Sequence, residues 1–162
     1  MKFITGIFLL LLTTTGFAQD PNLDDLAEAV EDYIEDYGLE DPEDILTWAE
    51  LPRLAQQGEA LTLTVTIENA REDEGFDLES VDLTWEFLDG YDVVSISPEP
   101  LDADNSMGSL TLYYNRVLEA GETMEVVFDL VAEKPGVHIG DVSIWDKDGS
   151  FLYRYVQSKI SR

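Results

Sequence analysis

Clusters of carboxylates are the residues of this sequence that could most directly do chemistry, because hard cations such as Ca²⁺ bind to grouped oxygen ligands. Residues 146–150 (DKDGS) begin like a calcium-binding loop, but the glutamate that such a loop places at its twelfth position is missing. The same residues are typical of a hairpin turn, with Gly149 in a left-handed conformation. We interpret them as a turn and keep Asp146 and Asp148 as candidates for weak calcium binding.

Two further acidic stretches could also offer oxygen ligands. Asp102 and Asp104 lie in a predicted loop over residues 101–108, and residues 72–74 lie with Asp77 in a second acidic loop. Both are interpreted as solvated loops, with weak calcium binding at the end of a domain as the alternative. We therefore expect no cofactor, and a calcium-dependent module is the second hypothesis for function.

The sequence shows no recognisable set of catalytic residues. The one histidine, His138, lies in an apolar run just after a turn, and no Gly-x-Ser-x-Gly nucleophile elbow occurs. Cysteine is absent, so the chain has no thiol nucleophile, no zinc-thiolate site and no disulfide. Because acidic residues are so numerous, a pair suitable for glycoside hydrolysis carries little information. We predict that the protein is not an enzyme.

Aromatic residues gather in the last predicted hairpin. A three-residue loop places Trp145 opposite Phe151, and strand alternation puts both on one face with Tyr153 and Tyr155. We predict that this aromatic face is the outer one, since the opposite face is aliphatic and belongs in the core. The members of that opposite face are Val142, Ile144, Leu152 and Val156, with Arg154 near the chain end.

An exposed aromatic face of this kind calls for a covering group. Residues 20–38 predict an amphipathic helix whose apolar positions recur at helical spacing and whose other positions are acidic. We favour the apolar stripe of this helix as the cover, because the stripe must be buried somewhere. The alternative is a docking platform for a protein or sugar. The stripe consists of Leu23, Leu26, Ala27, Val30, Ile34 and Tyr37.

After a linker over residues 39–44 the sequence alternates with period two, which is typical of half-buried strands. No helical segment interrupts the strands, so we predict an all-β fold, an antiparallel β-sandwich of seven to eight strands over residues 45–158. A sheet edge is a further possible docking surface. The predicted strands cover residues 45–50, 61–67, 81–87, 91–97, 109–117, 124–130, 137–145 and 151–157, with polar loops at 69–79 and 101–108.

The first 18 residues have the features of a cleavable signal peptide. Lys2 is followed by an apolar run over residues 3–12, and Gly16 and Ala18 are small residues placed for cleavage before Gln19. A membrane anchor is the alternative, but it needs about 20 apolar residues. We expect an exported protein, periplasmic or extracellular, without membrane insertion after cleavage.

The charge is strongly negative, with 35 acidic and 9 basic residues. Without Lys2 the chain keeps eight basic residues, and its net charge is −27. Such a field repels nucleic acid and anionic membranes, which we exclude as partners. Solubility in a salty medium, cation binding and docking on a basic partner remain as explanations.

Three segments resemble bacterial extracellular Ig-like modules of the CARDB and NEW3 kind. They are residues 58–69 (GEALTLTVTIEN), residues 118–128 (LEAGETMEVVF) and residues 132–142 (AEKPGVHIGDV). The resemblance implies an Ig-like sandwich that serves as an accessory, non-catalytic module. We therefore expect an exported module that binds a protein or carbohydrate partner or supports an envelope assembly.

Overall fold

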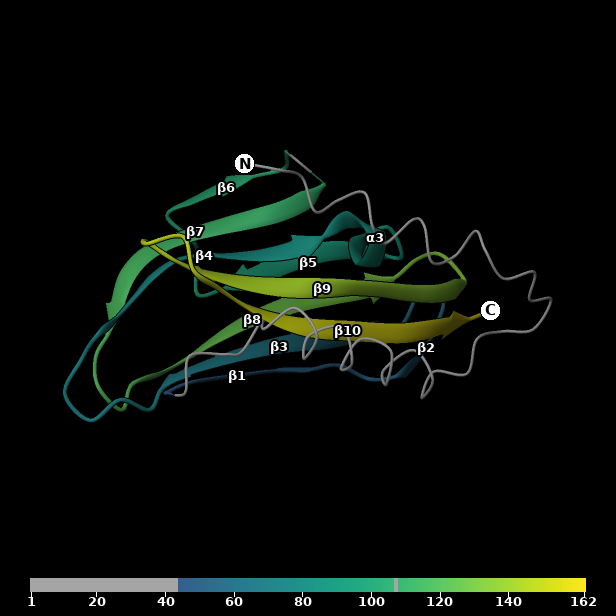
Figure 1. Cartoon of the computed structure of the whole chain (residues 1–162). Coiled ribbons are helices and arrows are strands. Elements are labelled where there is room, and N and C mark those ends of the chain that lie inside the picture. Colours follow the sequence, from purple (N-terminus) through teal and green to yellow (C-terminus); the bar gives the residue numbers. More distant parts are fainter. Residues whose placement is uncertain (1–43, 107) are drawn as a thin grey trace, which may run out of the picture. The chain divides into compact units, whose positions relative to one another are not determined.

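The computed structural model describes residues 44–106 and 108–162, which form two β-sheets packed face to face (Figure 1). In spatial order the four-stranded sheet contains β1 (Ile45–Glu50), β3 (Ala60–Asn69), β8 (Thr123–Ala132) and β5 (Tyr91–Ser97). The six-stranded sheet contains β2 (Leu54–Gln56), β10 (Phe151–Ser161), β9 (Gly136–Asp146), β4 (Phe76–Thr84), β7 (Ser109–Leu118) and β6 (Asp102–Asp104). The predicted Ig-like β-sandwich is confirmed.

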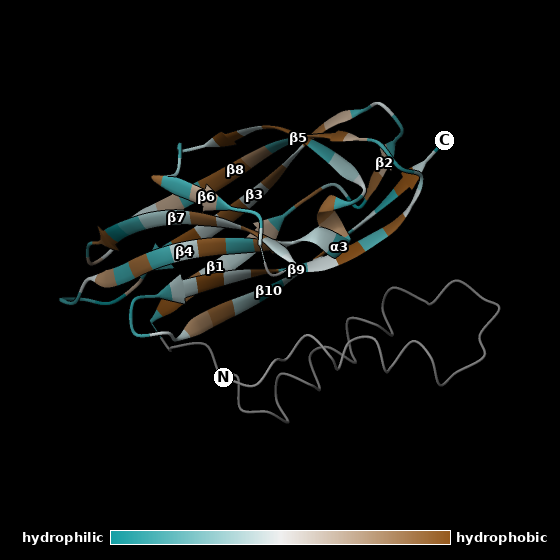
Figure 2. Cartoon of the chain, turned by 90° about the horizontal axis from the view of Figure 1, so that it is seen from above, coloured by the Kyte–Doolittle hydropathy of each residue, from teal (hydrophilic) through white to brown (hydrophobic). Residues whose placement is uncertain are grey.

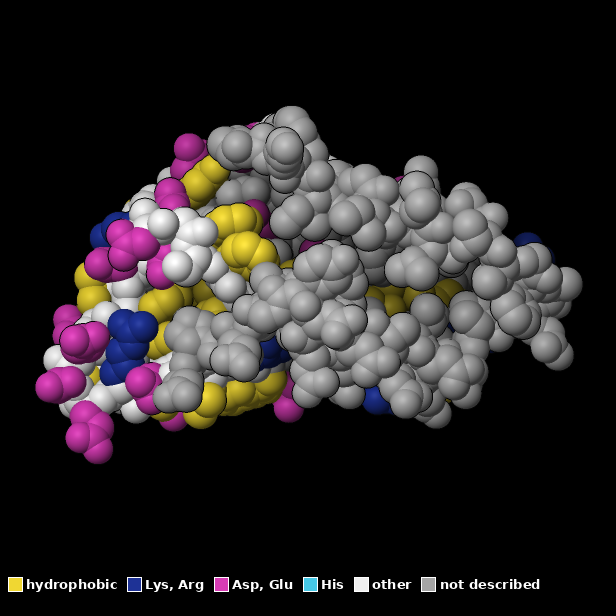
Figure 3. Space-filling view, viewed as in Figure 1, with side chains coloured by type: hydrophobic (Ala, Val, Ile, Leu, Met, Phe, Trp, Pro, Cys, Tyr) yellow, Lys and Arg dark blue, Asp and Glu magenta, His cyan; other side chains and the backbone are white. Residues whose placement is uncertain are grey.

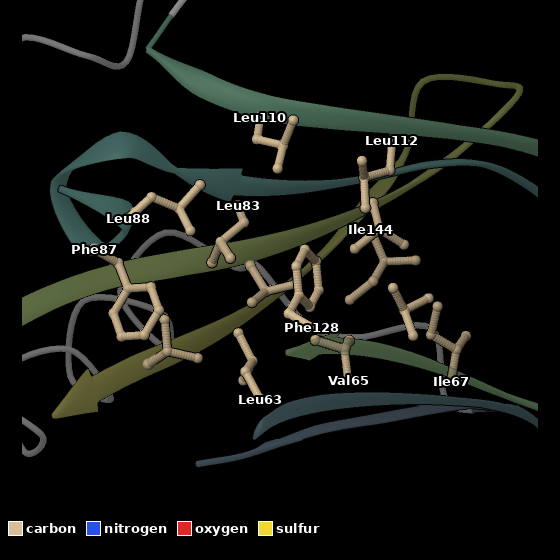
Figure 4. Close-up of a cluster of buried hydrophobic side chains, with 14 of the residues drawn as sticks. Leu63, Val65, Ile67, Leu83, Phe87, Leu88, Leu110, Leu112, Phe128 and Ile144 are labelled. Atoms are coloured by element: carbon tan, nitrogen blue, oxygen red, sulfur yellow. The ribbon is translucent and has the colours of Figure 1, made fainter. Parts of the chain in front are cut away.

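The core lies between the two sheets and follows from the alternation of the strands. Hydrophobic and hydrophilic residues alternate along the ribbons (Figure 2), so each strand turns one face inward. Leu63 and Phe128 of one sheet meet Leu83 and Ile144 of the other in a cluster of side chains without measurable exposure (Figure 4). This apolar burial is the main stabilising contribution, since no cysteine is present to form a disulfide.

The first part of the described chain passes from the four-stranded sheet to the six-stranded sheet. β1 pairs with β3 in the four-stranded sheet, and after three residues β2 pairs in parallel with the end of β10. The Arg154 Nε donates to the Thr47 main-chain oxygen at 2.6 Å, so this side chain bridges β10 and β1. The position of Arg154 on the aliphatic side of its strand is thereby explained.

Asn69, the last residue of β3, also joins the two sheets. Its side chain has no measurable exposure, and its Nδ2 donates to the main-chain oxygens of Glu74 at 2.8 Å and Leu118 at 2.9 Å. Buried main-chain oxygens of loops need such donors. Asn69, the last residue of the segment 58–69 that resembles Ig-like modules, therefore has a structural role.

One predicted strand is wrong in its second half. β4 begins at Phe76, inside the predicted loop 69–79, and ends at Thr84, where the four-residue helix α3 (Trp85–Leu88) begins. A Cβ on Gly140 of β9 would lie 2.2 Å from Thr84 Oγ1 and 2.7 Å from Phe87 Cβ. The bare backbone of Gly140 lets α3 pack closely on β9, and Phe87 enters the core from this turn.

Two short strands add to the seven or eight that were predicted. β2 and β6 have three residues each, too few for alternation to be recognised. The predicted loop over residues 101–108 is therefore wrong at residues 102–104, which form β6.

Within the described residues no helix is long and apolar enough to cross a membrane. The predicted signal peptide (1–18) and amphipathic helix (20–38) lie outside the described residues.

Candidate functional site

The outer face of the six-stranded sheet carries many of the polar and aromatic residues that the sequence singled out. Directly opposed residues of antiparallel strands share a face, so the strand registers arrange these side chains in rows. The first row crosses five strands, from β10 to β6. It contains Phe151, Trp145, Ser80, Tyr113 and Asp102.

Two more rows follow on the same face. The second contains Tyr153, Ser143, Asp82, Thr111 and Asp104. The third contains Tyr155, Asp141, Thr84 and Ser109, where the main-chain N–H of Asp141 donates to Thr84 Oγ1 at 3.0 Å. None of the residues in these three rows is basic.

Trp145, Phe151, Tyr153 and Tyr155 form what we call the aromatic column. Trp145 lies opposite Phe151, as the hairpin pattern predicted, and their ring centroids are 4.7 Å apart. All four side chains are half-buried, whereas the aliphatic residues on the opposite face of the hairpin are buried. The alternation therefore predicted the two faces correctly. What covers the column remains a prediction, because residues 20–38 lie outside the described part of the chain.

A pocket of about 270 Å³, here named the acidic pocket, opens beside the column. A β-bulge helps to form it, because Glu79 is an extra residue of β4 relative to β9 and joins Ser80 at the pocket wall. Carboxylates, hydroxyl groups and two aromatic rings line it. The lining residues are Glu79, Ser80, Asp82, Asp104, Ser106, Ser109, Thr111, Tyr113 and Trp145.

Asp82 is one of the three carboxylates that line the acidic pocket. Burial raises the pKa of its carboxyl, and hydrogen bonds from Ser80, Thr111 and Trp145 partly offset that rise. The Ser80 hydroxyl donates to Asp82 Oδ1 at 3.2 Å. The indole Nε1 of Trp145 is buried, and its approach to Asp82 lowers the pKa of that carboxyl without reaching full hydrogen-bond geometry. The acidic pocket therefore combines a hydrogen-bonded carboxyl, Asp82, with the buried indole Nε1 of Trp145 beside it.

A second carboxylate, Asp141, lies in the third row, directly opposite Tyr155 and close to Tyr153. Burial raises the pKa of this carboxyl to about 6, against a hydrogen bond from Tyr153 that lowers it, while the charge of Glu86 raises it further. Burial, with a smaller effect of the nearby Asp141 charge, also raises the pKa of Tyr155. Part of the charge of this face therefore changes near pH 6.

The four calcium candidates do not come together as a site. Asp146 Oδ1 accepts the main-chain N–H of Asp148 at 3.0 Å and of Ser150 at 2.8 Å, so this carboxylate closes the hairpin turn. Asp102 and Asp104 lie on β6, at the far edge of the sheet. No group of three metal-ligating residues occurs among residues 44–106 and 108–162.

His138 has a structural environment. Its Nε2 lies 2.7 Å from the Lys134 main-chain oxygen, and its ring packs edge-on against Tyr91. A Cβ on Gly90 would lie 2.5 Å from the imidazole. This packing agrees with the interpretation of His138 as a structural histidine.

Sequence reasoning missed the central residues of the face. Asp82 and Thr84 lie in the predicted strand 81–87, and Asp141 lies in the third resembling segment, but no motif marked any of them, or Thr111 and Tyr113, as part of a site. Their proximity depends on which strands are neighbours, namely β9, β4, β7 and β6. Alternation can place a residue on a face of its own strand, and only the strand order shows which strands share that face.

No family model and no curated protein matches the chain. Solved structures with a similar fold include a CARDB domain from Pyrococcus furiosus in complex with di-metal ions, at 12% identity and a TM-score of 0.49, covering 76% of this chain and 96% of that one. A cohesin module of a Clostridium perfringens family 33 glycoside hydrolase has 12% identity and a TM-score of 0.47, covering 72% and 96%. A PKD domain of an M14-like peptidase from a Thermoplasmatales archaeon has 10% identity and a TM-score of 0.43, covering 72% and 94%. At these identities the similarity concerns the fold alone.

Proposed function

We propose that this chain is an exported, non-catalytic accessory module that binds a protein or carbohydrate partner through the part of the outer face of its six-stranded sheet that β9, β4, β7 and β6 form. The arrangement in rows is the observation that supports the proposal. It puts the rings of Trp145 and Tyr113 side by side with hydroxyl groups and carboxylates across β9, β4, β7 and β6. Aromatic patches with adjacent polar groups are typical of docking surfaces.

Export is the part of the proposal that rests on the sequence of residues 1–18, which has the order of regions expected of a cleaved signal peptide. The non-catalytic part rests on two features of the described residues. His138 is held in a structural contact with Lys134, and the carboxylates of the three rows have no histidine or lysine in those rows to act with them.

A pair of matched variants tests the binding face. Thr111 lies on the outer face of β7, and Thr64 lies on the outer face of β3 in the other sheet; both are half-buried. Thr111→Lys puts a long cationic side chain among Asp82 and Asp104, whereas Thr64→Lys makes the same chemical change elsewhere. We expect Thr111→Lys to abolish binding of the secreted protein to arrays of cell-wall glycans and of peptides.

The control, Thr64→Lys, should keep the affinity of the wild-type chain within about threefold, since a lysine outside an interface changes association little. Equal binding by the wild type and Thr111→Lys, or no binding to either array, would contradict the proposed face. Equal melting temperatures of the two variants ensure that a loss of binding is not a loss of fold.

A further inference from the structure

We infer that the acidic pocket receives a lysine or arginine side chain presented by a basic polypeptide partner. This inference rests on the proposed function and adds the chemical class of the partner. Among the described residues, the pocket lies on the half of the outer face formed by β9, β4, β7 and β6, next to the aromatic column.

Charge complementarity is the first argument. Glu79, Asp82 and Asp104 line the pocket, and the three rows of the face contain no basic residue to neutralise them. By contrast, other described carboxylates pair with cations of the chain: Asp77 lies 2.7 Å from Lys147, and Asp89 lies 2.5 Å from Lys134. The acidic pocket therefore has the charge that a cationic side chain would complement.

The shape and the aromatic wall are the second argument. A pocket of about 270 Å³ can contain the end of a long side chain, and Trp145 and Tyr113 form part of its wall. Aromatic faces attract ammonium and guanidinium groups, most strongly when the contact is shielded from water. Arginine also presents several donors, which suits the hydroxyl and carboxylate oxygens of Thr111 and Asp104.

The remaining surface fits the same kind of partner. Acidic side chains are frequent on the visible part of the sandwich, and few basic side chains lie among them (Figure 3). The net charge of the whole chain is −26. A field of this sign accelerates encounter with a basic partner, and the pocket then provides a specific contact.

The test measures binding of a six-lysine peptide at 0.15 M salt, about physiological ionic strength. Asp82→Asn/Asp104→Asn removes two charges of the pocket. Glu68→Gln/Glu125→Gln removes two charges from β3 and β8 of the other sheet and is the matched control. We expect the pocket variant to bind about tenfold more weakly than the wild type and the control variant to lose less than about threefold. Acetylation of the lysines should abolish binding.

Equal losses in the two variants would overturn the inference, because the attraction would then come from the field of the whole molecule. Undiminished binding of the acetylated peptide would overturn it as well. If a neutral glycan binds and Thr111→Lys abolishes that binding while the pocket variant does not, the binding face stands and the cationic partner is wrong. Melting temperatures within a few degrees of the wild type show that the variants are folded.

Discussion

Asp141 shows how single residues make this face sensitive to pH. Its carboxyl is partly buried between the tyrosines of β10 and the end of β4, and its pKa is raised to about 6 from the usual 3.8. The folded state therefore holds this proton more tightly than the unfolded chain does. Folding is favoured at low pH by this group, and its contribution is lost as the pH rises from about 4 to about 6.

Asp141→Asn should remove the fall in stability that the ionisation of this carboxyl causes as the pH rises. We expect the variant to be more stable than the wild type by about 1–2 kcal/mol at pH 7, after allowance for partial exposure to solvent, and nearly equal to it at pH 4. Urea denaturation at both pH values measures the difference. The exposed Glu125→Gln serves as control, and its stability should follow the wild type more closely. Parallel pH curves for Asp141→Asn and the wild type would show that this carboxyl is not the cause.

At the scale of elements, the sequence predicts which segments form strands better than it predicts how those segments pack against the rest of the fold. The alternation in β3 and β10 predicted both the strands and their faces, because most inward residues are apolar and most outward ones are polar or aromatic. The polar exceptions on the inward side are Asn69, Arg154 and Ser158. The pattern failed at Trp85 and Phe87, which alternate like a strand but form α3. There α3 packs closely on the bare backbone of Gly140, a tertiary contact that no local pattern records.

The candidate site was predictable only in part for the same reason. Trp145 and Phe151 belong to one hairpin, so a local turn places them opposite one another. Tyr113 and Asp82 reach the same face through pairings between segments about 30 residues apart in sequence. A β-bulge also shifts the alternation at Glu79, and nothing local marks that position.

The amphipathic segment over residues 20–38 leads to a prediction at this scale. Its apolar stripe needs burial, and the aromatic column is the surface that the sequence suggests for it. We expect removal of residues 19–40 to lower the melting temperature and to shift the tryptophan emission to the red. Replacement of Glu28, Asp32 and Glu35 by serine, on the acidic side of the segment, should have neither effect. Unchanged stability and emission after the deletion would exclude this use of the column.

At the scale of the whole molecule, the acidity and the binding face explain different properties. The excess of carboxylates makes copies of the chain repel one another, and in our proposal it attracts a basic partner from a distance; salt screens both effects. In our proposal, the rows on the six-stranded sheet determine where the partner binds and which shape it must have. The four-stranded sheet also exposes apolar side chains, Leu46 at 46% and Trp48 at 39%, so it is the competing surface.

The most direct test of the proposed binding face is a residue-by-residue map of main-chain chemical shifts in the protein without residues 1–18. The map compares the free protein with the protein saturated by the ligand that binds most tightly in the array experiment. Our account predicts that the largest changes fall on Trp145, Asp82 and Thr111 of β9, β4 and β7, with little change on β3 and β8. Changes centred on Trp48 and its neighbours in the four-stranded sheet, or spread evenly over both sheets, would contradict it.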